Sequence, residues 1–286
     1  MTSRASRGLV SGTLPFSSVD GPGNRFVAFL QGCDFDCIAC HNPYTIAVCN
    51  ECGICVDHCA AGALTVVGGT VVWNPRACTG GDVCIEVCPH DSTPKARWLS
   101  VAELVERVRG PAPFLSGVTV SGGEATQQAA FVRAFFSALK ADDRLKRLTR
   151  FVDSNGSASR RIWDELDPVL DGAMIDLKAL DPEVHERITG RTNASVLASL
   201  RLLAERGKLA EVRLLLLPGM NDARDQLSRT ATWLCELDPH LPVKVIGFRR
   251  HGARPVAQAV PEPGPERMAG YADLLRAGGL SRLTVV

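Results

Sequence analysis

The sequence has almost no net charge and no long apolar run, and each of these two absences excludes a class of protein. Its 286 residues carry 32 Lys and Arg against 31 Asp and Glu, which gives a formal net charge of +1. Without an excess of one sign there is no strong field to attract nucleic acid or an anionic membrane surface, so we expect neither as a partner. No apolar stretch approaches the roughly 20 residues that a membrane-spanning helix needs.

A secretory signal is also lacking, because residues 1–18 contain no apolar core of the kind that such signals require. We therefore expect a cytoplasmic protein, in which thiols stay reduced. Cysteine, by contrast, is plentiful: 11 residues, of which ten lie between Cys33 and Cys88. Disulfides are disfavoured because the short spacings would crowd neighbours that need distant partners. Clustered cysteines in this setting indicate metal binding.

The ten cysteines fall into three sets along the chain. The first set is Cys33, Cys37 and Cys40; the second is Cys49, Cys52, Cys55 and Cys59; the third is Cys78, Cys84 and Cys88, followed by Pro89. A closed structural metal site takes four protein ligands. The first set offers three thiolates, so it indicates an iron–sulfur cluster with one iron left open for another ligand.

The second and third sets resemble the two runs of a bacterial two-cluster ferredoxin, in which the last cysteine of each run serves the other cluster. One cluster would use Cys49, Cys52, Cys55 and Cys88, and the other would use Cys59, Cys78 and Cys84. The latter lacks a ligand because Gly81 stands where the run has its second cysteine. Asp82 could supply an oxygen, or the cluster could be a three-iron or an open four-iron form. Zinc binding is the alternative for these seven cysteines.

Outside the cysteine-rich segment the pattern alternates between short apolar strands and amphipathic helices. Strands are predicted at Arg25–Gln31, 118–120, 148–153, 172–177, 211–217 and 243–248, and helices at 127–141, 194–206, 222–237 and 265–277. A further helix should begin after Ser100, which forms a capping box with Glu103. Continuous apolar strands are typical of a parallel sheet covered on both faces. The fold class is therefore α/β, with about six βα units that suit a partial (βα)6 barrel rather than eight.

The cysteine-rich segment interrupts the alternation of strands and helices, and this change predicts two structural units. Residues 1–46 and 96–286 should form the partial barrel, and residues 47–95 should form an inserted ferredoxin-like iron–sulfur domain. In such folds the chemistry gathers at the carboxyl ends of the strands. Cys33, Gly122, Asp153 and Asp176 all fall at those ends.

The segment CDFDCIACHN, placed directly after the first strand, resembles the C-x3-C-x2-C signature of the radical S-adenosylmethionine (SAM) superfamily. In that family three cysteines hold a [4Fe-4S] cluster, and the amino and carboxylate groups of SAM bind the fourth iron. One-electron reduction then cleaves SAM and yields a 5′-deoxyadenosyl radical. The cluster and cofactor carry this chemistry, while the protein supplies position and exclusion of water.

Further strings narrow the resemblance to the glycyl-radical-enzyme activating proteins, YjjW type. They are VDGPG, LQGC, CHNP, VTVSGGEAT, VDSNG, GAMIDLKA, ITGR, RLLAERGKLAE and RLLLLPG, and they cover nearly the whole chain. The resemblance implies an anaerobic radical SAM oxidoreductase that abstracts a hydrogen atom from a backbone glycine of a partner glycyl radical enzyme. It also implies two auxiliary iron–sulfur clusters and a reductant such as flavodoxin or ferredoxin.

The resemblance assigns roles position by position. Cys33, Cys37 and Cys40 would hold the SAM cluster and serve as the catalytic cysteines. The residues that would contact SAM are Ala39, Cys40, His41, Gly122, Gly123, Asp153, Asn155, Asp176, Leu177, Lys178 and Arg213. A monovalent cation beside SAM would bind Asp153, Met174 and Asp176, and Asp20 would lie near the glycine peptide. Glycine is expected at 122 and 123 because a Cβ would block the approach of SAM, and Arg213 is expected to pair with the SAM carboxylate.

Some residues and alternatives remain open at this stage. Arg249 replaces a family histidine, and neither it nor His251 receives a role. Cys235 is expected to be a packing residue. The alternatives to an activase are a radical SAM enzyme acting on a small molecule or peptide, and a non-catalytic ferredoxin-like electron-transfer protein.

Overall fold

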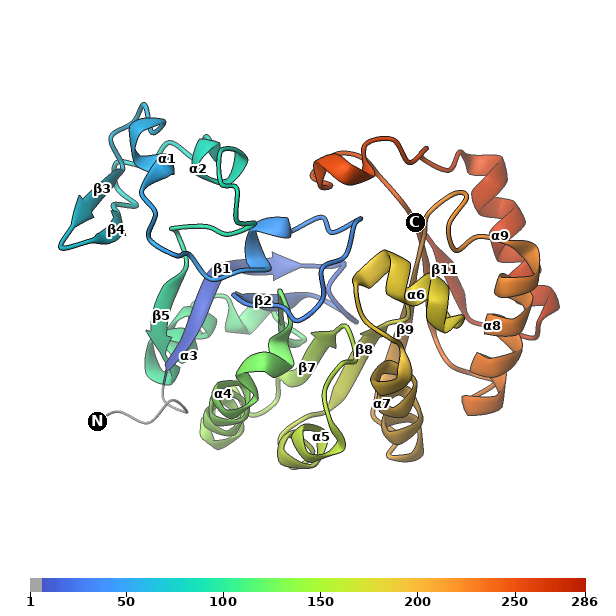
Figure 1. Cartoon of the computed structure of the whole chain (residues 1–286). Coiled ribbons are helices and arrows are strands. Elements are labelled where there is room, and N and C mark those ends of the chain that lie inside the picture. Colours follow the sequence, from blue (N-terminus) through green and yellow to red (C-terminus); the bar gives the residue numbers. More distant parts are fainter. Residues whose placement is uncertain (1–6) are drawn as a thin grey trace.

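A nine-stranded sheet forms the centre of the molecule, which we describe from a computed structural model over residues 7–286 (Figure 1). Residues 1–6, which the expected barrel unit 1–46 includes, lie outside the described part. The strand order is β11-β10-β9-β8-β7-β6-β2-β1-β5. The parallel strands are β2 (Arg25–Leu30), β6 (Gly117–Gly122), β7 (Thr149–Ser154), β8 (Gly172–Asp176), β9 (Leu209–Leu216), β10 (Val243–Gly247) and β11 (Leu283–Val285). The mostly parallel α/β sheet is consistent with a partial barrel, and the six predicted strands are confirmed.

Two further strands extend one edge of the sheet in a way that the sequence pattern did not predict. Strand β1 (Arg7–Ser17) pairs antiparallel with β2 and with β5 (Arg97–Ser100). β1 carries Gly8, Gly12 and Pro15 and is largely exposed along its second half, so it lacks the continuous apolar pattern of the buried strands. β5 has four residues, which is too short for a periodic signal. Tertiary pairing, rather than local preference, makes both into strands.

The helices cover the outside of the curved sheet (Figure 1). They are α3 (Val101–Arg109), α4 (Ala129–Ala141), α5 (Arg160–Leu166), α7 (Ala194–Glu205), α8 (Arg224–Leu237) and α9 (Pro265–Ala277); α6 (Pro182–Thr189) lies apart from them beside the strand ends. Four 3₁₀ turns are also described: η2 (Pro43–Thr45), η3 (Ala112–Phe114), η4 (Ala125–Gln128) and η5 (Pro255–Ala257). The predicted capping box is confirmed, since Ser100 and Glu103 exchange side-chain-to-backbone hydrogen bonds at the start of α3.

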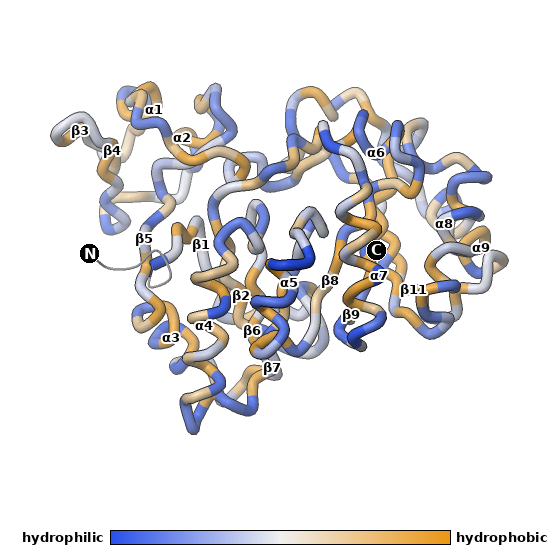
Figure 2. Tube along the Cα trace, turned by 60° about the horizontal axis from the view of Figure 1, so that its bottom comes forward, coloured by the Kyte–Doolittle hydropathy of each residue, from blue (hydrophilic) through white to orange (hydrophobic). Residues whose placement is uncertain are grey.

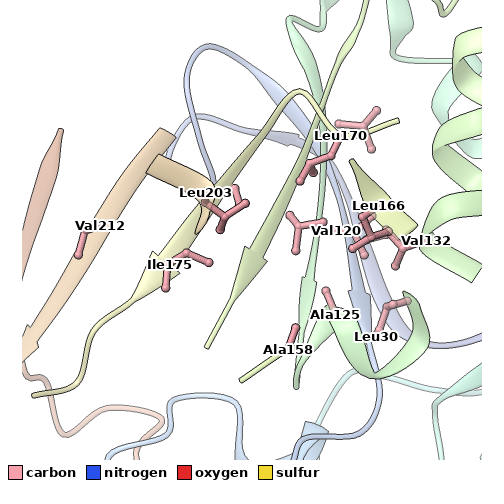
Figure 3. Close-up of a cluster of buried hydrophobic side chains, with 14 of the residues drawn as sticks. Leu30, Val120, Ala125, Val132, Ala158, Leu166, Leu170, Ile175, Leu203 and Val212 are labelled. Atoms are coloured by element: carbon pink, nitrogen blue, oxygen red, sulfur yellow. The ribbon is translucent and has the colours of Figure 1, made fainter. Parts of the chain in front are cut away.

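Apolar side chains from the strands and the covering helices form one continuous core. Val120, Ile175 and Val212 project from β6, β8 and β9 (Figure 3), and they are among the core residues with at most 1 % of their surface exposed. Figure 2 shows the same division along the chain, with hydrophobic segments in the strands and hydrophilic ones in the connections. Within residues 7–286 no helix is long and apolar enough to cross a membrane.

The segment from α1 (Ile54–Asp57) to α2 (Val83–Glu86) forms a small separate substructure beside the sheet (Figure 1, upper left). Besides these two single-turn helices it contains a two-stranded sheet, β3 (Leu64–Val67) and β4 (Thr70–Trp73). Its own buried cluster consists of Cys55, Leu64, Val71 and Cys84. Two of these four buried residues are cysteines.

Candidate functional site

The predicted SAM-site residues gather around one cavity of about 240 Å³ at the carboxyl ends of the parallel strands. The three cysteines, Ala39 and His41 come from the loop after β2, and the other residues come from β9 and from the ends of β6, β7 and β8. Of the predicted residues, Cys33, Cys37, Ala39, Cys40, His41, Gly122, Gly123, Asp153, Asn155, Asp176, Lys178 and Arg213 line it. Segments 180 residues apart in the sequence therefore meet at one place, as the rule for parallel α/β folds predicts.

Leu177 is the exception among the predicted contacts. Its side chain is 1 % exposed and belongs to the main core, and it lines a different, smaller cavity. Its backbone N–H donates to the Arg213 carbonyl at 2.9 Å. Adjacent strand residues point to opposite faces, so Leu177 turns inward when Asp176 and Lys178 face the site cavity. Its contribution to the site is through the backbone.

The three thiols of the first set are half-buried, and their surroundings disfavour the thiolate when no metal is bound. Burial raises the pKa of Cys33 to about 12 and that of Cys37 to about 11, and it also raises the pKa of Cys40. A bound metal stabilises the thiolate and removes the proton. The Asn155 amide lies 3.8 Å from Cys33 Sγ, where it can donate to a sulfur. The loop thus has the donor set and the buried surroundings that a three-thiolate cluster needs.

Gly122 and Gly123 are required for a reason other than the expected one. A Cβ on Gly122 would lie 2.2 Å from the backbone of Leu30, and its φ of +126° disfavours any other residue. A Cβ on Gly123 would lie 2.3 Å from the Gly32 carbonyl oxygen. The glycines therefore let the turn pack against β2 and the start of the cysteine loop. The space that a side chain would block is occupied by protein, not by the cavity.

Glu124, which the sequence analysis did not select, connects the glycine turn to the loop after β7. Its carboxylate accepts hydrogen bonds from Thr126 N–H and Oγ1 (2.9 and 2.5 Å), Ser154 Oγ (2.9 Å) and Asn155 N–H (2.7 Å). The side chain is fully buried, and burial raises its pKa to about 7 in spite of these donors. An acidic residue directly after two glycines, in the string SGGE, was the available signal.

The buried Arg213 has its anionic partners within the chain. It lies within 3.1 Å of the Asp153 carboxylate and 2.8 Å of Glu211, and it also donates to the carbonyl of Val19 at 3.3 Å. Burial, the largest effect, acts to lower the pKa of Arg213, but Asp153 and Asp176 hold it above its ordinary value. A SAM carboxylate is therefore not needed to explain the buried arginine, although Arg213 does reach the cavity.

Positive side chains also lie beside both acidic candidates for the monovalent cation. Asp153 pairs with Arg213, and Asp176 accepts a hydrogen bond from Lys178 at 2.7 Å. Met174 is buried with its Sδ 3.1 Å from Arg213 Nη2. These contacts already balance the two carboxylates, so the geometry adds no argument for a further cation at this place.

Other singled-out residues lie around the rim or away from the cavity. His41 Nε2–H donates to the carbonyl of Arg249 at 2.8 Å, so Arg249 contacts the site through its backbone. Among the described residues, neither Arg249 nor His251 lines the cavity. Asp20 pairs with Ser17 in the loop before β2, at the opposite end of that strand. Cys235 is a half-buried packing residue on α8, as expected.

Several cysteines of the insert lie close to one another, and the crosswise arrangement stays a prediction. Cys59, Cys78 and Cys84 line a second cavity of about 180 Å³ together with Gly81 and Asp82. Burial raises the pKa of Cys49, and the nearby Cys88 and Cys52 act in the same direction. Over residues 7–286 no three His, Cys, Asp or Glu side chains converge closely enough to share one metal ion. Thiolates around an iron–sulfur cluster bind separate irons, so they do not need to converge in that way.

The fold and site define an α/β protein with a half-buried three-thiol loop at the carboxyl edge of a parallel sheet. The family description "Radical SAM superfamily" matches residues 27–231, and the chain therefore belongs to the radical SAM superfamily. Enzymes of this family use SAM and a [4Fe-4S] cluster.

Similar proteins are activating enzymes. The chain is 29 % identical over 282 residues to a pyruvate formate-lyase-activating enzyme from Streptococcus mutans, a match that covers 94 % of this chain and 90 % of the relative. It is 28 % identical to an isethionate sulfite-lyase activating enzyme from Desulfovibrio desulfuricans, covering 87 % and 85 %. The solved structure of QueE from Escherichia coli shares the fold, with a TM-score of 0.53, 12 % identity, and coverage of 98 % and 94 %.

Proposed function

We propose that the chain is a glycyl-radical-enzyme activase, an enzyme that removes a hydrogen atom from a backbone glycine of a partner enzyme. The relatives that match over most of the chain are activating enzymes of pyruvate formate-lyase and isethionate sulfite-lyase, which are glycyl radical enzymes. The single observation that carries the proposal is the cavity that brings the three-thiol loop together with the glycine turn and the Asp and Asn residues after β7. The YjjW type remains a prediction.

In this proposal Cys33, Cys37 and Cys40 hold a [4Fe-4S] cluster, and SAM occupies the adjoining cavity. When bound, SAM and the cluster supply the one-electron chemistry that generates the hydrogen-abstracting radical. The chain's own residues position and shield the reactants. Glu124 fixes the backbone of Asn155, whose amide faces Cys33 Sγ, and Lys178 places a buried positive charge beside Cys37 and Cys40.

The insert at residues 47–95 would carry two auxiliary iron–sulfur clusters, and residues 1–46 with 96–286 would form the SAM-binding unit. The cavity shared by Cys59, Cys78 and Cys84, the proximity of Cys49 and Cys88, and the separate small core support this division. The clusters would accept electrons from a reductant such as flavodoxin or ferredoxin. A bound monovalent cation is not part of the proposal.

SAM cleavage is the direct test of the active site. After anaerobic reconstitution and reduction, the protein should convert SAM to 5′-deoxyadenosine and methionine. Cys37→Ala should abolish this conversion because two thiolates cannot retain the cluster, whereas Cys235→Ala, on α8, should retain it. If Cys37→Ala still cleaves SAM, the assignment of the first cysteine set is wrong.

The partner class is tested separately from SAM cleavage. The reduced protein and SAM are mixed with pyruvate formate-lyase or isethionate sulfite-lyase, and the partner is examined for a glycyl radical by electron paramagnetic resonance. A glycyl radical on either protein supports the activase. SAM cleavage without a radical on either enzyme, but with turnover of an added small molecule or peptide, would favour the alternative radical SAM function.

A further inference from the structure

The two short helices of the insert begin in the same way, and this aligns the two cysteine runs residue by residue. α1 follows Gly53, whose φ is +79°, and α2 follows Asp82, whose φ is +53°. Both are left-handed N-cap residues, and each lies two residues before a buried cysteine, Cys55 or Cys84. Cys52 and Gly53 of the first run therefore correspond to Gly81 and Asp82 of the second. The thiolate is absent from the second run, and a carboxylate stands one residue later.

Packing does not explain the missing cysteine. A Cβ added to Gly81 would meet only Thr79 Oγ1, at 4.0 Å, and the φ of Gly81 lies outside the left-handed region. The backbone therefore accepts a Cβ at this position without a close contact. The change to glycine must therefore be explained by what surrounds the site and not by a steric limit.

Asp82 occupies a backbone conformation that glycine adopts more readily. The left-handed region costs a non-glycine residue about 1 kcal/mol, although aspartate tolerates it better than most residues. The sister position shows that glycine is accepted at this point of the motif. Asp82 thus retains a small strain, which indicates that its side chain has a use.

Asp82 lines the cavity of the three cysteines with 59 % of its side chain exposed, and an ion pair holds its carboxylate. Asp82 and Lys95 both line the cavity with Cys59, Cys78 and Cys84, and Lys95 Nζ forms an ion pair with Asp82 Oδ1. In residues 7–286 no hydrogen bond reaches the second oxygen, Oδ2. The Lys95 side chain is 15 % exposed, although lysine is rarely buried without a partner. The lysine therefore fixes one carboxylate oxygen and leaves the other free.

We propose that Asp82 is the fourth protein ligand of the iron–sulfur cluster held by Cys59, Cys78 and Cys84, with Lys95 orienting the carboxylate. This rests on the auxiliary clusters of the proposed function. A lone pair of Oδ2 binds the iron that has no thiolate, so the step needs no oxidant or reductant. Ligating carboxylates are commonly held by a second hydrogen-bonding group, which is the position of Lys95. The carboxylate makes this corner of the cluster chemically different from the other three.

The test uses full-length protein with Cys33, Cys37 and Cys40 replaced by Ala, so that only the insert binds iron. After anaerobic reconstitution the parent should hold about eight irons per chain, four in each cluster. Asp82→Gly copies the sister run and relieves the backbone strain, so it should fold at least as well as the parent. We expect it to lose about one iron and to show, when oxidised, the electron paramagnetic resonance signal of a three-iron cluster.

Two further variants make the assignment specific. Gly81→Cys combined with Asp82→Gly recreates the Cys-Gly pair of the first run and should restore about eight irons. Lys95→Met should keep the iron and shift the midpoint potential of this cluster to lower values, because a positive charge that favours the reduced form is lost. Glu86→Gln, an exposed carboxylate on α2, is the control and should match the parent in iron content and spectrum.

The outcomes separate this inference from the proposed function. If Asp82→Gly retains about eight irons with an unchanged spectrum, the carboxylate is not a ligand and the inference is wrong. If Cys59→Ala leaves the parent's iron content unchanged, the crosswise auxiliary cluster itself is absent, and that part of the proposed function also fails. SAM cleavage by the otherwise unmodified enzyme is measured independently, and its loss would concern the first cysteine set.

Discussion

At the scale of single residues, Glu124 contributes most to the arrangement of the site without lining its cavity. It is fully buried and has four hydrogen-bond donors around two oxygens, from Thr126, Ser154 and Asn155. Hydrogen bonds donated to the carboxylate favour its ionised form and so act to lower its pKa. Burial nevertheless raises its pKa to about 7. The pKa that results from these two opposing effects lies within the physiological range of pH.

This balance predicts a pH dependence of stability. The folded pKa, about 7, lies above the ordinary value of 4.5, so the carboxyl has no effect on stability below about pH 4.5 and becomes increasingly destabilising up to about pH 7. The shift corresponds to about 3 kcal/mol of unfolding free energy at most. Denaturant unfolding of the reduced metal-free protein, measured from pH 4.5 to 8, should show this decline.

Glu124→Gln should lower stability throughout, because its NH₂ group must face one of the donors, and it should remove this part of the pH dependence. Glu236→Gln, at an exposed position on α8, should leave the pH profile unchanged. An identical slope in Glu124→Gln and the parent protein would show that the ionisation of Glu124 does not affect folding.

At the scale of elements, the turn after β6 is fixed by close contact with β2 and the segment that follows it. The parallel pairing ends at Leu30 and Gly122, and the two backbones come too close for a side chain at that point. The cysteine loop therefore begins at a place defined by glycine packing. The position of the first thiol follows from this contact.

Gly122→Ala should destabilise the fold by at least about 2 kcal/mol, since the new Cβ overlaps backbone atoms and the positive φ is unfavourable. Chemical denaturation of the metal-free protein measures the change. Gly12→Ala on β1 is the control, because nothing lies within 4 Å of the position its Cβ would take. Equal stability of the two variants would contradict the packing argument.

The strands and helices also differ in how well they could be predicted from the sequence. The buried parallel strands were found because they are nearly continuous apolar runs, as in Val212–Leu216 with Arg213 as its one charged residue, and their ends placed Cys33, Asp153 and Asp176 together. β1 and β5 were missed because their pairing is long-range and half-exposed. Glu124 and the partners of Arg213 were missed because both depend on contacts between segments that are distant in the sequence. The sequence pattern places Arg213 within an apolar strand, but it does not show which carboxylates lie beside it.

At the scale of the whole molecule, Arg254 connects three parts that are distant in the sequence. It donates to Asp36 Oδ1 at 2.5 Å and to the Cys37 carbonyl at 3.3 Å within the cysteine loop, and it lies 2.8 Å from Asp91 at the end of the insert. The segment after β10 thereby joins the first cysteine set to the cysteine-rich unit. Its pKa is raised: burial acts to lower it, but Asp36 and Asp91 outweigh that effect.

Arg254→Met keeps the aliphatic stem but removes these bonds. Because the partner carboxylates are partly exposed, global stability should fall by less than about 1 kcal/mol. Hydrogen–deuterium exchange of residues 34–40 and 88–95 should nevertheless become faster, since both segments lose a shared anchor. Arg276→Met, which breaks only a surface pair with Asp273, should not change exchange there. Unchanged exchange in Arg254→Met would mean that other contacts hold the two segments.

The order of the strands has a consequence for how the chain folds. From β7 to β11 each strand pairs with the strand that comes before it in the sequence, and helical crossovers connect these neighbours. Strands that pair in order of synthesis find their partner already present on the ribosome. β5 and β6 must both wait, because they pair with β1 and β2 only after the whole cysteine-rich segment has been made. Joining β1 and β2 to β5 and β6 therefore depends on a long closure, while β7 to β11 can be added one strand at a time.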